Sequence, residues 1–150
     1  TCFYEPSQKW LLSADMLLPL TPTPAIEMKV DQETEREISI IRLLQSFDRM
    51  KQLPIDQVFP GHGAPFGEHQ TLIETQVVRI HLRKEECLQA IRKGHTSFYE
   101  LFQQLYPNAF NIFTLSMLKG YLDLLEVEEK ITVHTAEGYR KYRVNSLVQQ

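Results

Sequence analysis

Two residues with metal-ligand chemistry, Asp15 and His62, each follow directly on a short apolar stretch. Asp15 comes after residues 10–14, and His62 comes after residues 57–60 and stands between two glycines. Carboxylate oxygens and imidazole nitrogens bind divalent metals, and glycine neighbours leave an imidazole sterically open. An aspartate among apolar residues is costly to bury unless it is paired or bound to a metal. Both residues are therefore candidate metal ligands.

Each of these stretches also has an ordinary structural interpretation. A Pro/Gly turn can contain a histidine that has no function, and Asp15 could cap the turn that follows it. Among the other histidines, His69 could line a pocket but is more typical of a surface or helix-start residue. We expect His81 to be solvated on a charged helical face, and His95 and His134 receive no role.

The first half of the chain predicts strands and a helix that would position the two candidates. Residues 1–19 are typical of a β-hairpin that turns at 5–8. Residues 19–26 contain three prolines, which exclude a helix and predict an exposed extended loop, either beside the site or as a solvent linker. An amphipathic helix is expected over 32–51, with Asp31 as N-cap or Thr34 as a weaker alternative. A short strand, 55–59, then leads into the His62 loop.

The second half predicts three helices followed by a β-hairpin. The helices are expected over 71–93, ending at Gly94, over 98–106 with Thr96 or Ser97 as N-cap, and over 110–125. Two strands are expected over 128–134 and 139–144. This order is the layout of a winged helix. The exposed side of the first helix is predicted to be charged: Arg79, Arg83, Lys84, Glu85, Glu86, Arg92 and Lys93.

Composition indicates a soluble intracellular protein, and we expect a cytoplasmic one. The formal charge of −3 argues against a strongly electrostatic nucleic-acid binder. Cys2 and Cys87 lie far apart and predict reduced, packed thiols. No apolar run approaches the length of a membrane span, and nothing is typical of a signal peptide.

Three segments, taken in order, resemble the C-terminal half of the metallo-β-lactamase fold superfamily. They are Cys2-Phe3-Tyr4-Glu5-Pro6, Ser13-Ala14-Asp15 and Pro60-Gly61-His62-Gly63. Superfamily members more often have glycine where Ala14 stands. The resemblance implies an α/β fold, half of an αββα sandwich, over residues 1–77. Residues 78–150 resemble the mostly α, winged-helix-like C-terminal extension of lactamase-beta-like proteins.

The same resemblance implies a metal-dependent hydrolase with one or two zinc ions in the complete protein. Asp15 would bridge two metals, and His62 would ligate the second. Metal-activated water would attack a small-molecule ester, thioester, amide or phosphodiester. The superfamily's HxHxDH motif is absent from this sequence, and two ligands are too few for a stable zinc site. We therefore expect a piece of a longer protein that is inactive on its own.

A rival interpretation is a non-catalytic winged-helix adaptor or nucleic-acid-binding module. Residues 139–143 alternate aromatic and basic side chains, as nucleic-acid binders can. However, any half-buried strand alternates, and the helix expected over 110–125 carries only Lys119 as a cation. Nucleic acid is thus an unlikely partner, and packing or a protein contact is favoured for this module. An exposed sheet edge predicts possible homo-oligomers.

Overall fold

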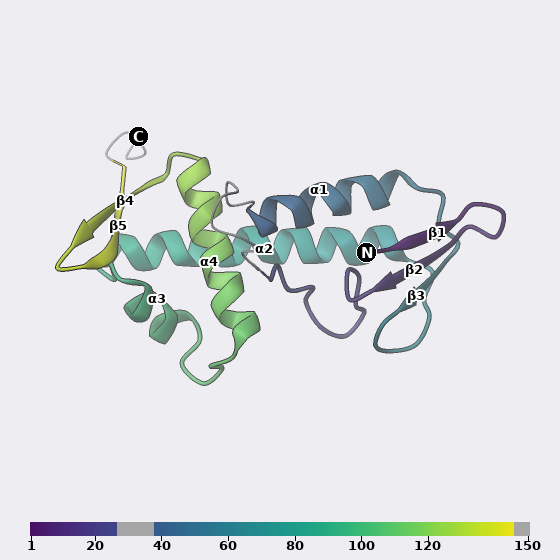
Figure 1. Ribbon diagram of the computed structural model, residues 1–150, viewed down its shortest axis with the longest axis horizontal. Helices are drawn as coiled ribbons and strands as arrows, with labels where there is room; N and C mark the ends of the chain where they lie inside the picture. The colour runs from purple at the N-terminus through teal and green to yellow at the C-terminus, as the bar shows by residue number, and fades with distance from the viewer. Residues whose placement is uncertain (27–37, 146–150) are drawn as a thin grey trace. The chain divides into compact units, whose positions relative to one another are not determined.

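The computed structural model describes residues 1–26 and 38–145 (Figure 1). Contacts divide the chain into two compact units, and the boundary falls within the long helix α2, His69–Arg92. Unit 1 comprises residues 1–24 and 41–79, and unit 2 comprises the described residues of 25–40 and 80–150. The domain limits expected from the sequence, 1–77 and 78–150, stay a prediction.

Unit 1 is built on a three-stranded sheet. Its strands are β1 (Phe3–Glu5), β2 (Trp10–Ala14) and β3 (Gln57–Pro60), with β2 in the centre. β1 pairs antiparallel with β2, which confirms the predicted hairpin. β2 pairs parallel with β3, so the carboxyl ends of these two strands lie at the same edge of the sheet.

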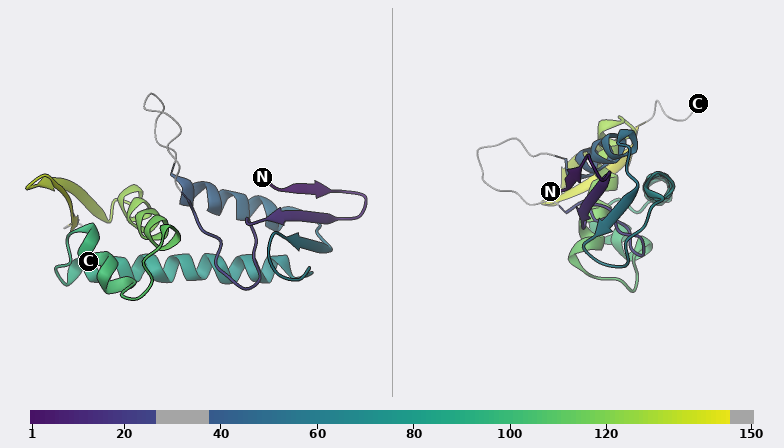
Figure 2. Two further views of the ribbon diagram at one scale, coloured as in Figure 1. Left: turned by 60° about the horizontal axis from the view of Figure 1, so that its bottom comes forward. Right: turned by 90° about the vertical axis from the view of Figure 1, so that its right-hand side faces the viewer.

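The core of unit 1 lies on one face of this sheet. Leu11, Phe47, Val58 and Ile73 are each at most 2% exposed, and burying a side chain of this size contributes about 1.5–3 kcal/mol. Helix α1 (Ser39–Gln52) runs alongside the first half of α2 (Figures 1 and 2). Its last turn contacts α2 through an ion pair of 2.9 Å between Lys51 and Glu74.

Helix α1 begins later than the sequence indicated. The predicted start at residue 32 and the predicted cap at Asp31 lie outside the described residues, and Ile38 is not helical. The predicted α-to-β step into the His62 loop is confirmed, since α1 ends at Gln52 and β3 begins at Gln57.

Unit 2 contains the end of α2, then α3 (Phe98–Leu105), α4 (Ile112–Val127) and the strands β4 (Ile131–Ala136) and β5 (Tyr139–Val144) (Figure 2). The predicted stop at Gly94 is confirmed, because this glycine has a φ of 100° after α2 ends.

Capping side chains start two helices of unit 2. Ser97 caps α3 in a capping box with Glu100, as one of the two predicted alternatives. Asn111 caps α4 in the same way with Thr114, a cap that sequence reasoning missed. These boxes fix where each helix begins.

The two strands of unit 2 form an antiparallel hairpin, as predicted. Its turn residues, Glu137 and Gly138, have φ angles of 54° and 79°. Positive φ at both positions is what a two-residue hairpin turn demands. Tyr142 on β5 is 3% exposed, and its N–H donates to the carbonyl of Thr96 at 2.8 Å.

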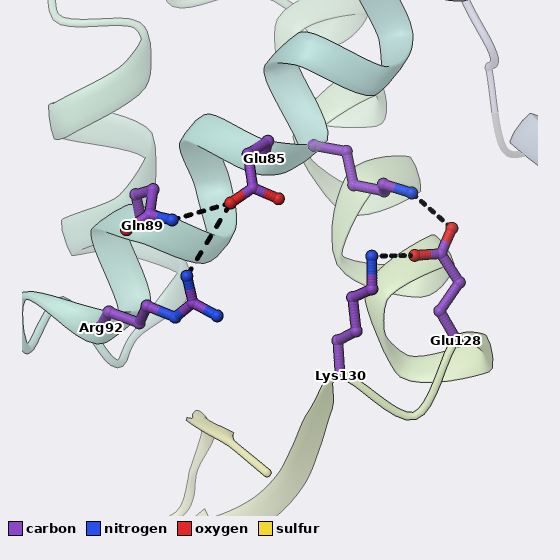
Figure 3. A network of polar contacts seen from close by, with 6 residues as sticks. Glu85, Gln89, Arg92, Glu128 and Lys130 are labelled. Atoms are coloured by element: carbon purple, nitrogen blue, oxygen red, sulfur yellow. Dashed lines mark hydrogen bonds and ion pairs between the residues drawn. The ribbon is translucent and has the colours of Figure 1, made fainter. Parts of the chain in front are cut away.

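A buried lysine corrects one expectation about α2. Lys84, predicted on the exposed side, is only 6% exposed, and its Nζ hydrogen-bonds to Glu128 at the end of α4. Lys130 binds the other oxygen of Glu128 at 3.1 Å, whereas Glu85 contacts Gln89 and Arg92 on α2 itself (Figure 3). Lys84 thus stabilises the packing of α2 and α4 within unit 2.

Both cysteines are free, as expected. Cys87 is completely buried on α2, and this burial raises the pKa of its thiol to about 12. Burial also raises the pKa of Cys2. Both thiols are therefore held in the protonated, weakly reactive form at neutral pH.

Candidate metal site

Asp15 is positioned by an irregular end of β2. The pairing register between β2 and β3 shifts between Leu12 and Ala14, and Ala14 has a φ of 46°. Ser13 is fully buried, and its hydroxyl donates to the carbonyl of Leu17 at 3.1 Å. This local bulge turns the backbone so that Asp15 leaves the strand at the carboxyl end of β2.

His62 is positioned by the glycine loop that follows β3. The N–H of Gly61 donates to the carbonyl of Ala14 at 2.8 Å, so the two strand ends are tied together. A Cβ placed on Gly61 would lie 2.7 Å from Oδ1 of Asp15 and 3.1 Å from the carbonyl carbon of Ala14. Only glycine permits this close approach.

The structure brings the two predicted ligands together. Nε2 of His62 lies 3.5 Å from Oδ1 of Asp15, and their side chains are 80% and 66% exposed. An open carboxylate and an open imidazole that converge at the end of two parallel strands fit two positions of a zinc ligand shell. Within residues 1–26 and 38–145 they are joined by no third histidine, cysteine, aspartate or glutamate in ligand position.

The other histidines have different environments. His81 is exposed, as predicted. His69 opens α2, but it is 5% exposed rather than on the surface, and its Nε2 is buried without a hydrogen-bond partner among the described residues. No described contact connects His69 to Asp15 or His62, so its predicted alternative role in a pocket stays a prediction.

The loop after Asp15 is partly buried, contrary to expectation. It is non-helical over 19–26, as predicted, but the chain bends at residues 19–21. Thr23 and Ala25 are each only 4% exposed. The N–H of Thr23 donates to the side chain of Gln76 on α2 at 3.0 Å. Sequence reasoning missed this anchor because Gln76 lies 53 residues away along the chain.

None of the helices in the described ranges combines the length and apolar character needed to cross a bilayer.

No family model matches the chain. In sequence the chain is similar to the probable metallo-hydrolase YqjP of Bacillus subtilis (strain 168), with 31% identity over 133 residues, 87% of this chain and 41% of that protein.

Two solved structures have a similar fold. One is a metallo-beta-lactamase family protein from Thermus thermophilus, with 21% identity and a TM-score of 0.79 over 96% of this chain and 44% of that protein. The other is a beta-lactamase domain protein from Burkholderia ambifaria, with 22% identity and a TM-score of 0.83 over 96% of this chain and 43% of that protein. The chain spans less than half the length of each of these relatives.

Proposed function

We propose that this chain is the C-terminal portion of a metal-dependent hydrolase of the metallo-β-lactamase superfamily, in which Asp15 and His62 are metal ligands. The similarity to a probable metallo-hydrolase and the fold shared with a metallo-beta-lactamase family protein and a beta-lactamase domain protein agree with the resemblance seen in the sequence, and they support this proposal. The observation that carries the proposal is the 3.5 Å approach of Asp15 Oδ1 to His62 Nε2.

Each of these residues has a definite task in this proposal. Asp15 supplies carboxylate oxygens that can serve two metal ions, and His62 supplies one imidazole nitrogen. Gly61 keeps the space beside the Asp15 carboxylate free of a side chain. Zinc, once bound, lowers the pKa of a coordinated water and polarises the substrate carbonyl or phosphoryl oxygen. Because two ligands do not hold zinc stably, we propose that the remaining ligands come from the part of the protein that this chain does not span, and that the chain alone is inactive.

The proposal extends to the second unit. Three helices followed by a hairpin in unit 2 support a winged-helix-like assignment for residues 78–150. A protein contact suits it better than nucleic acid, because Tyr142, one of the alternating aromatic residues of β5, is buried. The alternative, a non-catalytic adaptor, predicts a protein that binds no metal. A cytoplasmic location stays a prediction.

Metal content of the longer protein tests this function. We expect Asp15→Asn and His62→Ala each to weaken zinc binding by at least about tenfold, since each removes one direct ligand. Elemental analysis should therefore find less zinc in each purified variant than in the wild type. Asp56→Asn is the matched aspartate control, because the Asp56 side chain is 67% exposed, close to the 66% of Asp15. His81→Ala, on an exposed part of α2, is the histidine control. Absence of zinc from the wild-type protein would favour the adaptor, whereas unchanged zinc content in both ligand variants would contradict the assignment of Asp15 and His62 as ligands.

A further inference from the structure

The segment that follows Asp15, residues 16–24, is held firmly against the rest of unit 1, and we refer to it as the strap. Thr23 donates two hydrogen bonds. Its backbone N–H donates to Gln76 Oε1 at 3.0 Å, and its hydroxyl donates to the carbonyl of Met16 at 3.0 Å. Gln76 also donates to the carbonyl of Leu18 at 3.3 Å. Leu17 and Leu18 are buried at 0% and 7% exposure. The strap is therefore a fixed feature rather than a free linker.

One side chain of the strap points away from this anchored base. Leu20 is 86% exposed, the highest value for a large apolar side chain among the described residues. A single exposed leucine on a free loop needs no explanation. Here the residues on both sides, Leu18 and Thr23, are buried and hydrogen-bonded, so the backbone holds Leu20 in water at a fixed place.

The strap adjoins both candidate ligands. Asp15 directly precedes the strap in sequence. Further along the strap, the ring of Pro19 lies against the His62 loop. A Cβ built on Gly63 of that loop would lie 3.2 Å from Cγ of Pro19. Gly63 has a φ of 95°, and glycine is the residue that adopts such a backbone without strain. Pro19 therefore lies beside the loop that carries His62, and Leu20 is the next residue of the chain.

We propose that Pro19 and Leu20 bind an apolar group of the substrate next to the bond that is hydrolysed. This inference rests on the proposed function and narrows its substrate class. The strap, Met16-Leu17-Leu18-Pro19-Leu20-Thr21-Pro22-Thr23-Pro24, contains no cationic residue. A phosphodiester needs cationic or hydrogen-bonding groups beside its oxygens, whereas an apolar acyl chain gains free energy by covering an exposed leucine. The favoured substrate is therefore an ester or thioester with an apolar acyl chain.

Chain-length dependence of hydrolysis tests the strap in the longer, zinc-loaded protein. The probes are p-nitrophenyl esters with acyl chains of two, four and eight carbons, and bis(p-nitrophenyl) phosphate. We expect kcat/KM to rise with acyl length and to exceed that for the phosphodiester. Leu20→Ala should lower kcat/KM for the longest ester by about tenfold, with little change for the shortest, because pocket methylenes contribute on this scale. The effect should appear mainly in KM.

Two control variants separate substrate binding from general damage. Leu20→Met keeps an apolar side chain of similar size and should retain the chain-length preference. Leu82→Ala removes an exposed leucine of α2, 61% exposed, and should leave every rate unchanged. Zinc content should stay the same in all three variants, since none removes a proposed ligand.

The possible results distinguish this inference from the function on which it rests. Zinc-dependent ester hydrolysis with the same chain-length profile in wild type and Leu20→Ala overturns the role of the strap and leaves the hydrolase intact. Faster cleavage of the phosphodiester than of any ester also overturns the inference alone. A protein that holds zinc through Asp15 and His62 but hydrolyses none of the probes overturns the acyl-ester class. Absence of zinc binding overturns both proposals.

Discussion

Ala14 has an unfavourable backbone conformation at the most sensitive point of the candidate site. Its φ of 46° lies in the left-handed region, where a residue with a Cβ is less stable by roughly 1–2 kcal/mol. The resemblance stated from the sequence expects glycine at this position, and the structure supplies the physical reason. The hydrogen bond from Gly61 to the carbonyl of Ala14 helps hold the strained residue and so fixes the direction of Asp15.

Replacing Ala14 by glycine should therefore stabilise the chain. We expect Ala14→Gly to raise the free energy of unfolding by about 1 kcal/mol, because relief of left-handed strain outweighs the added entropy of the unfolded chain. Urea denaturation followed by circular dichroism measures the change.

Ala64 provides the matched control for this substitution. It lies in the loop after His62, is exposed, and does not have a positive φ. Ala64→Gly should lower the free energy of unfolding slightly, since only the unfolded-state entropy changes. A loss of stability in Ala14→Gly equal to that in Ala64→Gly would contradict the proposed strain.

At the residue scale, the sequence predicted the two candidate ligands but not the residues that support them. Asp15 and His62 could be singled out because each ends an apolar stretch, and parallel strands bring such ends together. The roles of Ser13, Gln76 and Thr23 could not be found in the same way. Their burial depends on hydrogen bonds to residues that local patterns do not connect, such as the 53-residue separation between Thr23 and Gln76.

At the scale of elements, the packing of α2 and α4 depends on the ion pair between the buried Lys84 and the more exposed Glu128. Burial alone would raise the pKa of Glu128, but hydrogen bonds from Lys84 and Lys130 lower it below the ordinary value of 4.5. The folded carboxyl therefore binds a proton more weakly than the unfolded one. This contribution to stability is present above pH 4.5 and is lost as the pH falls through the folded-state pKa.

Removing the charge of Glu128 should show this pH dependence directly. We expect Glu128→Gln to lower the free energy of unfolding by about 2 kcal/mol at neutral pH, because Lys84 loses a charged partner in a buried place. The difference from wild type should shrink as the pH is lowered below 4.5. Urea denaturation at a series of pH values measures it.

Glu74→Gln is the control for this pair. Glu74 forms an ion pair with Lys51 in which its side chain is 61% exposed, and exposed pairs contribute little to stability. Its substitution should have a much smaller effect. A difference between wild type and Glu128→Gln that stays constant from neutral to acidic pH would contradict the proposed linkage.

The helices and strands were largely predictable because their apolar spacing and end signals are local. Gly94 and Ser97 mark the ends of neighbouring helices by φ and by capping. Lys84 was wrongly predicted to be exposed. Helical periodicity separates the two sides of one helix, but it carries no information about a partner such as Glu128, which lies 44 residues later in the chain.

At the scale of the whole molecule, one face of the sheet in unit 1 remains uncovered by the described residues. Phe3, Trp10 and Leu12 are 67%, 42% and 48% exposed. Phe3 alternates with the half-buried Tyr4 on β1, and Trp10 and Leu12 alternate with the buried positions of β2. β1 also stands at the edge of the sheet. Exposed apolar faces and open edges promote association with another chain.

The chain on its own should therefore self-associate. We expect its average mass in sedimentation velocity to increase with concentration, and Leu12→Lys to shift it toward the monomer by placing a charge on the apolar face. Leu82→Lys, on α2, is the control and should not change the mass. A wild-type chain that stays monomeric at every concentration would contradict this prediction.

We propose that Asp15 and His62 bind the same metal ion in the longer protein. Anomalous scattering from crystals of that protein grown with zinc tests it most directly. We expect a zinc peak at coordination distance, about 2.0–2.2 Å, from both a carboxylate oxygen of Asp15 and a ring nitrogen of His62. Zinc bound elsewhere, with neither side chain among its ligands, would contradict it.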